Sequence, residues 1–243
     1  MILTLLGIAL QGLAIVVLAD FAAGLIHWAE DAYFTENTPV LGRLLIRPNI
    51  IHHHYPRFFT RYTWFQSSWD LLLLGAVVLA GAWLCGLLTW QVWLFVAVSI
   101  NANEIHKWSH RTRKENGPLI SRLQDWRILQ TPRQHAVHHT DPKNTYYCPI
   151  TNVVNPVLEK LRFWTGLEWV IWRLTGLRHR DDTSVRGQGP GPKWLTAYRP
   201  AYKVPAPVLT TPAGSLPPAA RAPSASHVCC GNCALCRHRH AHA

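Results

Sequence analysis

Eight of the fourteen histidines in this chain fall into four short groups within its first 139 residues. The groups are His27, then His52 and His53, then His106 and His110, and finally His135, His138 and His139. Residues three or four apart lie on one face of a helix, so the last two groups can each present several imidazoles together. Neutral imidazole is the commonest protein ligand for metals, and the pattern therefore predicts metal binding.

The number of histidines indicates more than one ion. A single zinc ion takes three or four protein ligands, so eight are too many for one site and about right for two. Any one of these groups alone could consist of ordinary helix-end or surface histidines. The prediction of metal binding rests on the occurrence of all four groups in one chain. His54 is expected to extend its pair without being a ligand, and His179 to be a surface residue.

Acidic and amide residues near these groups are candidates to fix the tautomer of a ligating imidazole. Each also fits a helix cap or a surface charge, and none is assigned as a direct ligand. The candidates are Asp31, Asn103, Glu104, Asp125 and Asp141.

The first apolar segment runs from residue 2 to residue 19 and continues through Asp20 to His27. It is long enough to cross a bilayer, which takes about 20 residues. It lacks a basic start and is too long for the apolar core of a signal peptide, so we expect a retained membrane helix. A carboxylate at this depth is costly unless it faces a partner, and Asp20 is therefore predicted to point into the protein.

A second apolar segment, residues 71–100, contains no charged side chain. As one helix it would measure about 45 Å, which exceeds the roughly 30 Å hydrocarbon core. Two helices are predicted, at 67–86 and 88–108, with a tight turn at 86–91. Trp83, Trp90 and Trp93 near this turn fit an interfacial aromatic belt.

The fold class that follows is all-α: an integral membrane protein with about three transmembrane helices and a cytoplasmic, histidine-rich cap. Residues 115–180 would form the cap, with one helix at 119–129 and an amphipathic stretch at 154–174 on the membrane surface. Basic residues flank the predicted hairpin and are missing from its turn, which places the histidines and the C-terminus in the cytoplasm. These residues are Arg43, Arg47, Arg57 and Arg61 before the hairpin, and Lys107, Arg111, Arg113 and Lys114 after it.

Charge and composition divide the chain into a lipid-facing domain at 1–182 and a tail at 183–243. The net charge is +11, and the tail, rich in Pro, Ala, Arg and His, contains no Asp or Glu. We expect the tail to be disordered. Its Cys229, Cys230, Cys233 and Cys236, followed by three histidines, could bind a soft metal, but a solvated tail is the preferred interpretation. The charge is explained by the tail and by helix-orienting loops, so no nucleic-acid partner is predicted.

Several motifs resemble the Kua family of membrane lipid desaturases, also called the plasmanylethanolamine desaturase family, which has a bacterial carotenogenesis-type member. The resemblance covers about residues 15–182. Its motifs are 19–21 through 27–28, 47–48 through 52–61, 105–110, 123–126, 132–139 and 155–164. The segment after His53 and the tail depart from the family pattern, which leaves the substrate open.

The resemblance implies a di-iron centre held by the eight histidines His27, His52, His53, His106, His110, His135, His138 and His139. Two iron ions and molecular oxygen would supply the oxidant that removes hydrogen from an unactivated methylene. The implied reaction forms the vinyl ether bond of plasmalogens from a plasmanyl (alkyl ether) phospholipid. Electrons would come from a cytochrome b5-like protein or a ferredoxin, for which the basic cap is a docking face.

Two other classes of function share these features. An acyl-lipid desaturase or a hydroxylase would use the same metal site. A non-catalytic membrane protein that binds or transports metal would also need intramembrane histidine and aspartate. Against transport, the histidines are predicted to gather at one side of the membrane, where they mark no route across it.

Overall fold

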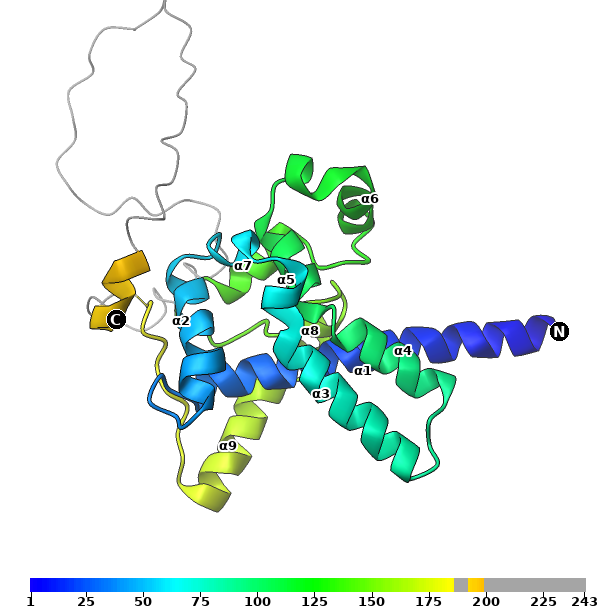
Figure 1. The fold of residues 1–243 in the computed structure, drawn as a ribbon, viewed down its shortest axis with the longest axis horizontal. Helices are drawn as coiled ribbons and strands as arrows, with labels where there is room; N and C mark the ends of the chain where they lie inside the picture. Colours follow the sequence, from blue (N-terminus) through cyan, green and yellow to red (C-terminus); the bar gives the residue numbers. More distant parts are fainter. Residues whose placement is uncertain (186–191, 199–243) are drawn as a thin grey trace, which may run out of the picture. The chain divides into compact units, whose positions relative to one another are not determined.

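The computed structural model describes residues 1–185 and 192–198, which form helices and no β-strand (Figure 1). The predicted all-α class is therefore confirmed. The α-helices are α1 (Ile2–Ala32), α2 (Arg47–His54), α3 (Trp64–Leu84), α4 (Trp90–Ser99), α5 (Ala102–His110), α6 (Arg113–Asp125), α7 (Pro132–His138), α8 (Val154–Lys160) and α9 (Phe163–Thr175). Short π and 3-10 segments are η1 (Gly42–Ile46), η2 (Phe59–Arg61) and η3 (Lys193–Tyr198).

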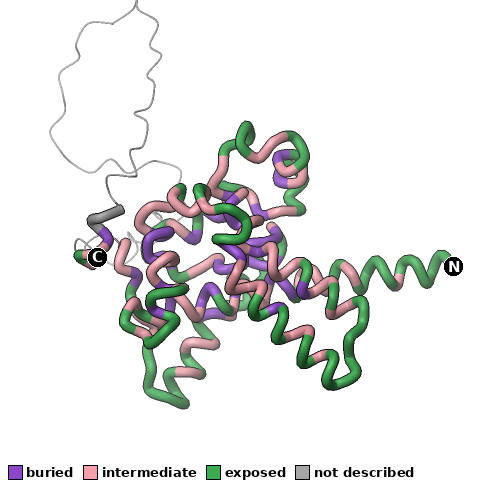
Figure 2. Tube along the Cα trace, viewed as in Figure 1, coloured by how far each residue is buried: buried purple, intermediate pink, exposed green. Residues whose placement is uncertain are grey.

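Two of the described helices, α1 and α3, are long and apolar enough to cross a membrane. Their most apolar windows are only 6% and 17% buried within the protein. A core helix of a soluble protein would be mostly covered, whereas Figure 2 shows many exposed residues along these helices, among them Leu5, Leu13 and Leu73. Exposed apolar surface on this scale fits a lipid environment.

The predicted turn of the hairpin is confirmed, but the single helix predicted after it is wrong. Gly86 adopts a left-handed φ of 68° between α3 and α4. Beyond α4 the helix is interrupted at Ile100 and Asn101, where the Asn101 amide donates to the Ala97 carbonyl and accepts from the Trp64 indole. Such side-chain bonds compete with the helical ladder. With ten residues, α4 measures about 15 Å, so a third span remains a prediction.

The helix predicted at 119–129 begins earlier, at Arg113. Thr112 and Glu115 form a reciprocal capping box, which the sequence interpretation overlooked. Gly117, with φ 72°, and Pro118 kink the helix. The stretch predicted at 154–174 is divided as well, because Arg162 takes a left-handed conformation between α8 and α9.

Asp20 is the central polar anchor of the fold and is fully buried, which confirms the sequence prediction. Its carboxylate accepts hydrogen bonds from the Ile150 amide (2.7 Å), the Thr151 amide (2.8 Å) and the Thr151 hydroxyl (2.6 Å). One turn later in α1, a Cβ on Gly24 would clash with the Cys148 sulfur. These contacts hold the loop before α8, residues 145–151, directly against α1.

Aromatic side chains fill the core beside this loop. Trp28 of α1 stacks on Trp164 of α9 with ring centroids 5.8 Å apart, and Tyr147, which is fully buried, meets Trp164 at 4.9 Å. The opposite face of α9 exposes Trp169 and Leu174. Apolar side chains therefore lie both on the packed side of α9 and on its exposed side, and the amphipathic, membrane-surface position predicted for this stretch stays a prediction.

Part of the predicted tail is described. In η3, Leu195 is buried and the Arg47 guanidinium lies 5.3 Å from the centre of a Trp194 ring. The cysteine- and histidine-rich stretch at 229–242 lies outside the described residues. The domain boundary at 182 remains a prediction.

We expect Asp20→Ala to destabilise the protein by about 3 kcal/mol, because two buried backbone amides would lose their acceptor. The thermal unfolding midpoint in detergent micelles measures this loss. Asp125→Ala is the matched control, because its carboxylate pairs with Arg113 on the exposed surface and should leave the midpoint nearly unchanged. Equal midpoints for the two variants would contradict the anchoring role of Asp20.

Candidate metal centre

The eight predicted histidines come together with one carboxylate in two adjacent groups. They are carried by α1, α2, α5 and α7, with His139 directly after α7. Within each group the potential ligand atoms all lie within 4.8 Å of one another. The five-histidine group comprises His52, His106, His110, His135 and His139, and the Asp31 group comprises His27, Asp31, His53 and His138.

In the five-histidine group, Nε2 atoms face one another. The Nε2 of His106 lies 2.9 Å from that of His135 and 3.3 Å from that of His110, and His139 approaches His135 at 3.1 Å. A contact between two ring nitrogens needs a proton on one of them, and one shared proton cannot satisfy three such contacts. His52 is 4% exposed, and neither of its ring nitrogens has a partner among the described residues. Buried nitrogens in this arrangement fit a bound cation.

In the Asp31 group, outer hydrogen bonds fix the tautomers. The Nδ1 atoms of His27, His138 and His53 donate to the Tyr147 carbonyl (3.0 Å), the Thr145 carbonyl (2.8 Å) and the Asp182 carboxylate (2.5 Å). Each ring therefore directs inward its Nε2, the nitrogen left to bind a metal. These Nε2 atoms lie 3.4 to 3.6 Å from the Asp31 carboxylate oxygens. Three imidazoles and one carboxylate form a donor set suited to iron or zinc.

Burial keeps most of these rings neutral, which is the form that binds metal. It lowers the pKa of His135 and His138 well below the usual value and that of His110 to about 3. His53 differs: burial acts against it, but Asp31 and then Asp182 raise its pKa. The pKa of Asp182 is lowered by the His53 hydrogen bond despite its burial, so this group stays a carboxylate.

Asp182 is a site residue that the sequence interpretation missed. Its second oxygen accepts bonds from the Ser184 amide (2.7 Å) and hydroxyl (2.5 Å), which hold the carboxylate toward His53. Nearby, the Arg180 amide donates to the Ala32 carbonyl and ties this segment to the end of α1. The only signal in the sequence was an acidic pair, Asp181 and Asp182, within a basic stretch. The role of Asp182 could not be predicted from that pair, because it depends on a contact with His53 of α2, 129 residues earlier in the chain.

The five acidic and amide residues predicted to orient a ligating imidazole have different positions in the structure. Asp31 belongs directly to a ligand group and also accepts a 2.6 Å bond from Asn49. Asn103 instead donates to the Ser67 carbonyl. The remaining three are ion-paired outside both groups: Glu104 with Lys107 and Arg111, Asp125 with Arg113, and Asp141 with Lys143.

The two histidines predicted to be non-ligands lie outside both groups. His54 contacts the Thr183 hydroxyl at 3.2 Å. His179 is less exposed than predicted, since 20% of its side chain is accessible and its Nε2 lies 3.4 Å from the Tyr147 hydroxyl.

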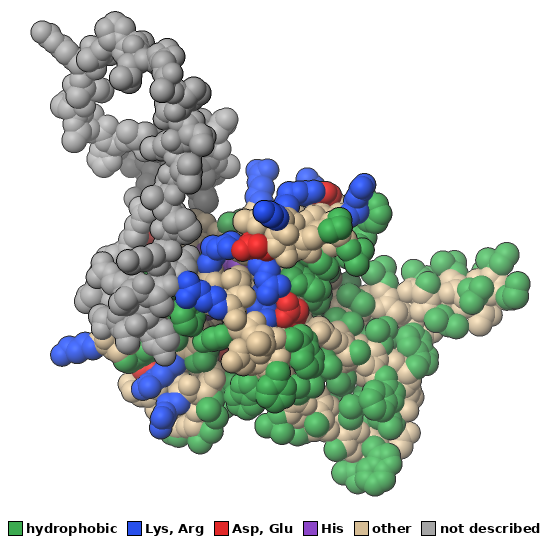
Figure 3. Space-filling view, turned by 45° about the horizontal axis from the view of Figure 1, so that its top comes forward, with side chains coloured by type: hydrophobic (Ala, Val, Ile, Leu, Met, Phe, Trp, Pro, Cys, Tyr) green, Lys and Arg blue, Asp and Glu red, His purple; other side chains and the backbone are tan. Residues whose placement is uncertain are grey.

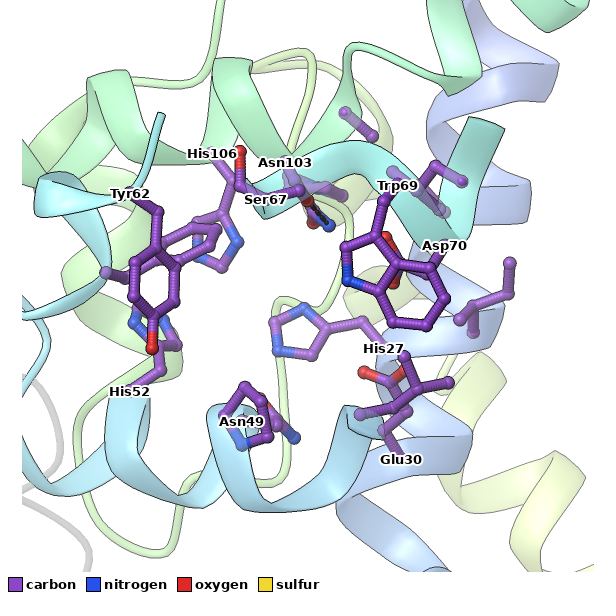
Figure 4. A pocket seen from close by; sticks show the side chains of 18 of the residues that line it. His27, Glu30, Asn49, His52, Tyr62, Ser67, Trp69, Asp70, Asn103 and His106 are labelled. Atoms are coloured by element: carbon purple, nitrogen blue, oxygen red, sulfur yellow. Dashed lines mark hydrogen bonds between the residues drawn. The ribbon is translucent and has the colours of Figure 1, made fainter. Parts of the chain in front are cut away.

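A cavity of about 240 Å³ reaches both groups at once (Figure 4). His27 of the Asp31 group and His52 and His106 of the five-histidine group line it. The rest of its wall comes mainly from α1, α2 and the first turns of α3, including Glu30, Asn49 and Trp69. A molecule in this cavity would lie directly beside the converging imidazoles.

A family model described as a lipid desaturase domain matches residues 16–182, which contain every member of both groups. The chain belongs to this lipid desaturase family. It is 33% identical to plasmanylethanolamine desaturase 1 of Mus musculus over 68% of this chain, and 34% identical to the plasmanylethanolamine desaturase of Myxococcus xanthus over 68%. A probable fatty acid desaturase of Acanthamoeba polyphaga mimivirus is 32% identical over 74% of this chain and 90% of its own length. No solved structure matches the chain.

The two apolar helices fit a membrane protein, as expected for a member of this family. The chain spans 65% of the length of the mouse relative and 60% of the Myxococcus relative. A relative with a different name, fatty acid desaturase 4 of Arabidopsis thaliana, is 34% identical over 71% of this chain and 54% of its own length. The family is therefore settled, and the particular substrate is a separate question.

We expect Asp182→Asn to weaken metal retention by the Asp31 group about tenfold to a hundredfold, because His53 would lose its charged partner. Metal content per chain, measured after dialysis against a graded series of chelator concentrations, tests this. Asp181→Asn is the matched control, since Asp181 is the exposed neighbouring carboxylate. Identical retention curves for the two variants would contradict the role of Asp182.

Proposed function

We propose that this chain is an oxygen-dependent di-iron desaturase that forms the vinyl ether bond of plasmalogens from a plasmanyl phospholipid. The observation that carries the proposal is the convergence of two ligand groups beside one cavity. The eight histidines, and Asp31 with them, would hold two iron ions. The family and its named relatives support the reaction class.

Bound iron would supply the oxidising power that amino-acid side chains lack, by activating molecular oxygen. The overall reaction removes two hydrogens from adjacent carbons. One oxygen molecule, those two hydrogens, two further protons and two electrons from a donor protein yield two waters. The electron donor is proposed to be a cytochrome b5-like protein or a ferredoxin.

The residues of the chain would hold the site in one geometry. Carbonyl groups of Thr145 and Tyr147 orient two imidazoles, and Asp182 orients a third. Buried walls limit the access of water to the centre, where a potent oxidant would otherwise react with solvent. The cavity is the route by which substrate carbons would reach the imidazoles.

The polarity of this cavity favours carbons close to a lipid headgroup. Asn49, Tyr62, Gln66 and Asn103 line it together with the histidines, so its walls are mixed rather than uniformly apolar. The carbons of a vinyl ether adjoin the glycerol oxygen, and they would enter such a space together with polar atoms. An acyl-lipid desaturase or a hydroxylase with the same metals is the second candidate, supported by the relatives named fatty acid desaturases.

We further propose that the metal centre and the C-terminus face the cytoplasm. Lys and Arg side chains gather on the face shown in Figure 3, over the segments that surround the centre. Arg57, Arg113 and Lys114 are exposed, whereas the turn between α3 and α4 contains no basic residue. The same basic face would attract an acidic electron donor.

Lipid mass spectrometry on cells that express the chain and receive an alkyl ether phospholipid tests the reaction. We expect acid-labile vinyl ethers with the wild-type chain and none with His106→Ala combined with His110→Ala, because both rings belong to the five-histidine group. His54→Ala is the matched control, as this histidine adjoins the ligands but lies outside both groups. Absence of vinyl ether from an iron-loaded wild type with a working donor would reject the plasmanyl substrate.

Sidedness is tested by labelling intact cells with a membrane-impermeant maleimide. In a chain whose sole cysteine is the exposed Cys85 of the hairpin turn, we expect labelling from outside. With the sole cysteine moved to position 57 by Arg57→Cys, we expect labelling only after lysis. The reverse pattern would invert the proposed topology.

A further inference from the structure

A series of oxidisable aromatic side chains leads away from the candidate metal centre. It begins with Tyr147, whose ring centroid lies 5.4 Å from that of His138. The ring of Trp164 in α9 lies 4.9 Å from Tyr147, and Trp28 of α1 stacks on Trp164 at 5.8 Å. Tyr33, directly after α1, meets Trp28 at 5.3 Å. Every step is within the roughly 4.5 to 7 Å at which aromatic rings interact, so we call these four residues the aromatic series.

Burial decreases from one end of the aromatic series to the other. Tyr147 is 0% exposed, Trp164 3% and Trp28 6%, whereas Tyr33 is partly exposed. Packing of an apolar core could be achieved equally well by phenylalanine, which holds its electrons tightly. Tyrosine and tryptophan are the aromatic side chains that give up an electron most easily. The series therefore joins the buried imidazoles to solvent entirely through rings that can be oxidised.

Two members of the aromatic series also have a proton acceptor. Loss of an electron makes a phenol or an indole strongly acidic, so a basic neighbour stabilises the oxidised form. The Trp28 indole donates to the Glu168 carboxylate at 3.1 Å, and the Tyr147 hydroxyl lies 3.4 Å from Nε2 of His179. Glu168 and His179 are 3.8 Å apart, and 20% of each side chain is accessible to solvent. The indole nitrogen of Trp164 has no partner among the described residues, which suits a ring that only relays an electron.

We propose that the aromatic series protects the candidate metal centre by passing electrons inward when oxygen has been activated there and no lipid is bound. The inference rests on the proposed desaturase function and adds a protective one. Without a lipid, the nearest oxidisable groups would be the ligating imidazoles themselves. Ordinary donor proteins are far too weak as oxidants to take an electron from tyrosine or tryptophan, so the series would conduct only while a potent oxidant is present.

The electron balance defines what the aromatic series must deliver. Reduction of one oxygen molecule to two waters takes four electrons and four protons. With lipid present, the donor protein supplies two electrons, and the lipid supplies the other two together with its two hydrogens. Without lipid, the series would supply the missing two electrons one at a time. A small thiol outside the protein would replace them, since two thiols become one disulfide and release two electrons and two protons.

The test uses the full-length protein in detergent, loaded with ferrous iron under nitrogen and then mixed with oxygen in the absence of lipid. Two ferrous ions give up two electrons, so the other two must come from the protein. We expect an organic radical signal by electron paramagnetic resonance in freeze-quenched samples. Peptide mass spectrometry should then find oxidised Trp28 and Tyr33 beside unmodified ligand histidines. Glutathione added before the oxygen should prevent both modifications.

Tyr147→Phe interrupts the aromatic series at its first step and removes only one hydroxyl, so the ring still fills the core. We expect this variant to lose the modification of Trp28 and Tyr33 and to accumulate oxidised His138, which glutathione should no longer prevent. Trp164→Phe interrupts the second step, and oxidation should stop at Tyr147. Trp169→Phe is the matched control, because Trp169 is an exposed tryptophan of α9 outside the series and should leave the wild-type pattern unchanged.

Iron per chain is measured on every preparation before oxygen is added. Unmodified aromatic residues in iron-loaded wild type would overturn the protective role, and so would equal modification of Trp28 in wild type and in Tyr147→Phe. Protection of Tyr147→Phe by glutathione would also overturn it, because the thiol would then reach the centre by another route. No lipid takes part in this measurement, so failure to form vinyl ethers would reject the proposed reaction without changing this result.

Discussion

The hydrogen bonds between Asp20 and the segment at 150–151 are the constraint on which the candidate metal centre depends. They are made in the interior of an apolar helix, where an unpaired carboxylate or backbone amide would be costly. They fix the loop before α8 against α1, and that loop supplies the Tyr147 and Thr145 carbonyls to His27 and His138. Imidazoles from segments more than 100 residues apart are thus oriented by one buried acid that touches none of them.

A second set of contacts extends this scaffold toward α5 and α7. The Gln130 amide donates to the Cys148 carbonyl, and its backbone carbonyl accepts from Gln124 and Ser109. Asn155 closes the network by exchanging two bonds with the Cys148 backbone. Because each buried polar group here has a partner, the network stabilises one arrangement of the helices that carry the ligands.

The sequence was sufficient for the features that depend on residue type and local spacing. Eight histidines at helical intervals, a buried Asp20 and a turn at Gly86 all follow from periodicity and from the cost of charge in an apolar segment. The sequence was insufficient to predict features that depend on a contact with a residue far away in the chain. Asn101 interrupts a helix because Trp64 lies opposite, and Asp182 reaches His53 because the chain folds back over α1. Asp31 became a potential ligand only when three imidazoles were placed around it.

The adjacency of His52 and His53 has a thermodynamic consequence for assembly. These neighbours on α2 belong to different groups, and so do His138, the last residue of α7, and His139 directly after it. An ion in one group would fix the backbone of both segments and would lower the entropic cost of arranging the ligands of the other group. Linkage requires the effect to be mutual, since each ion raises the affinity for its partner by the same factor. The ordering contributed by an ion in one group would thus favour occupation of the other group.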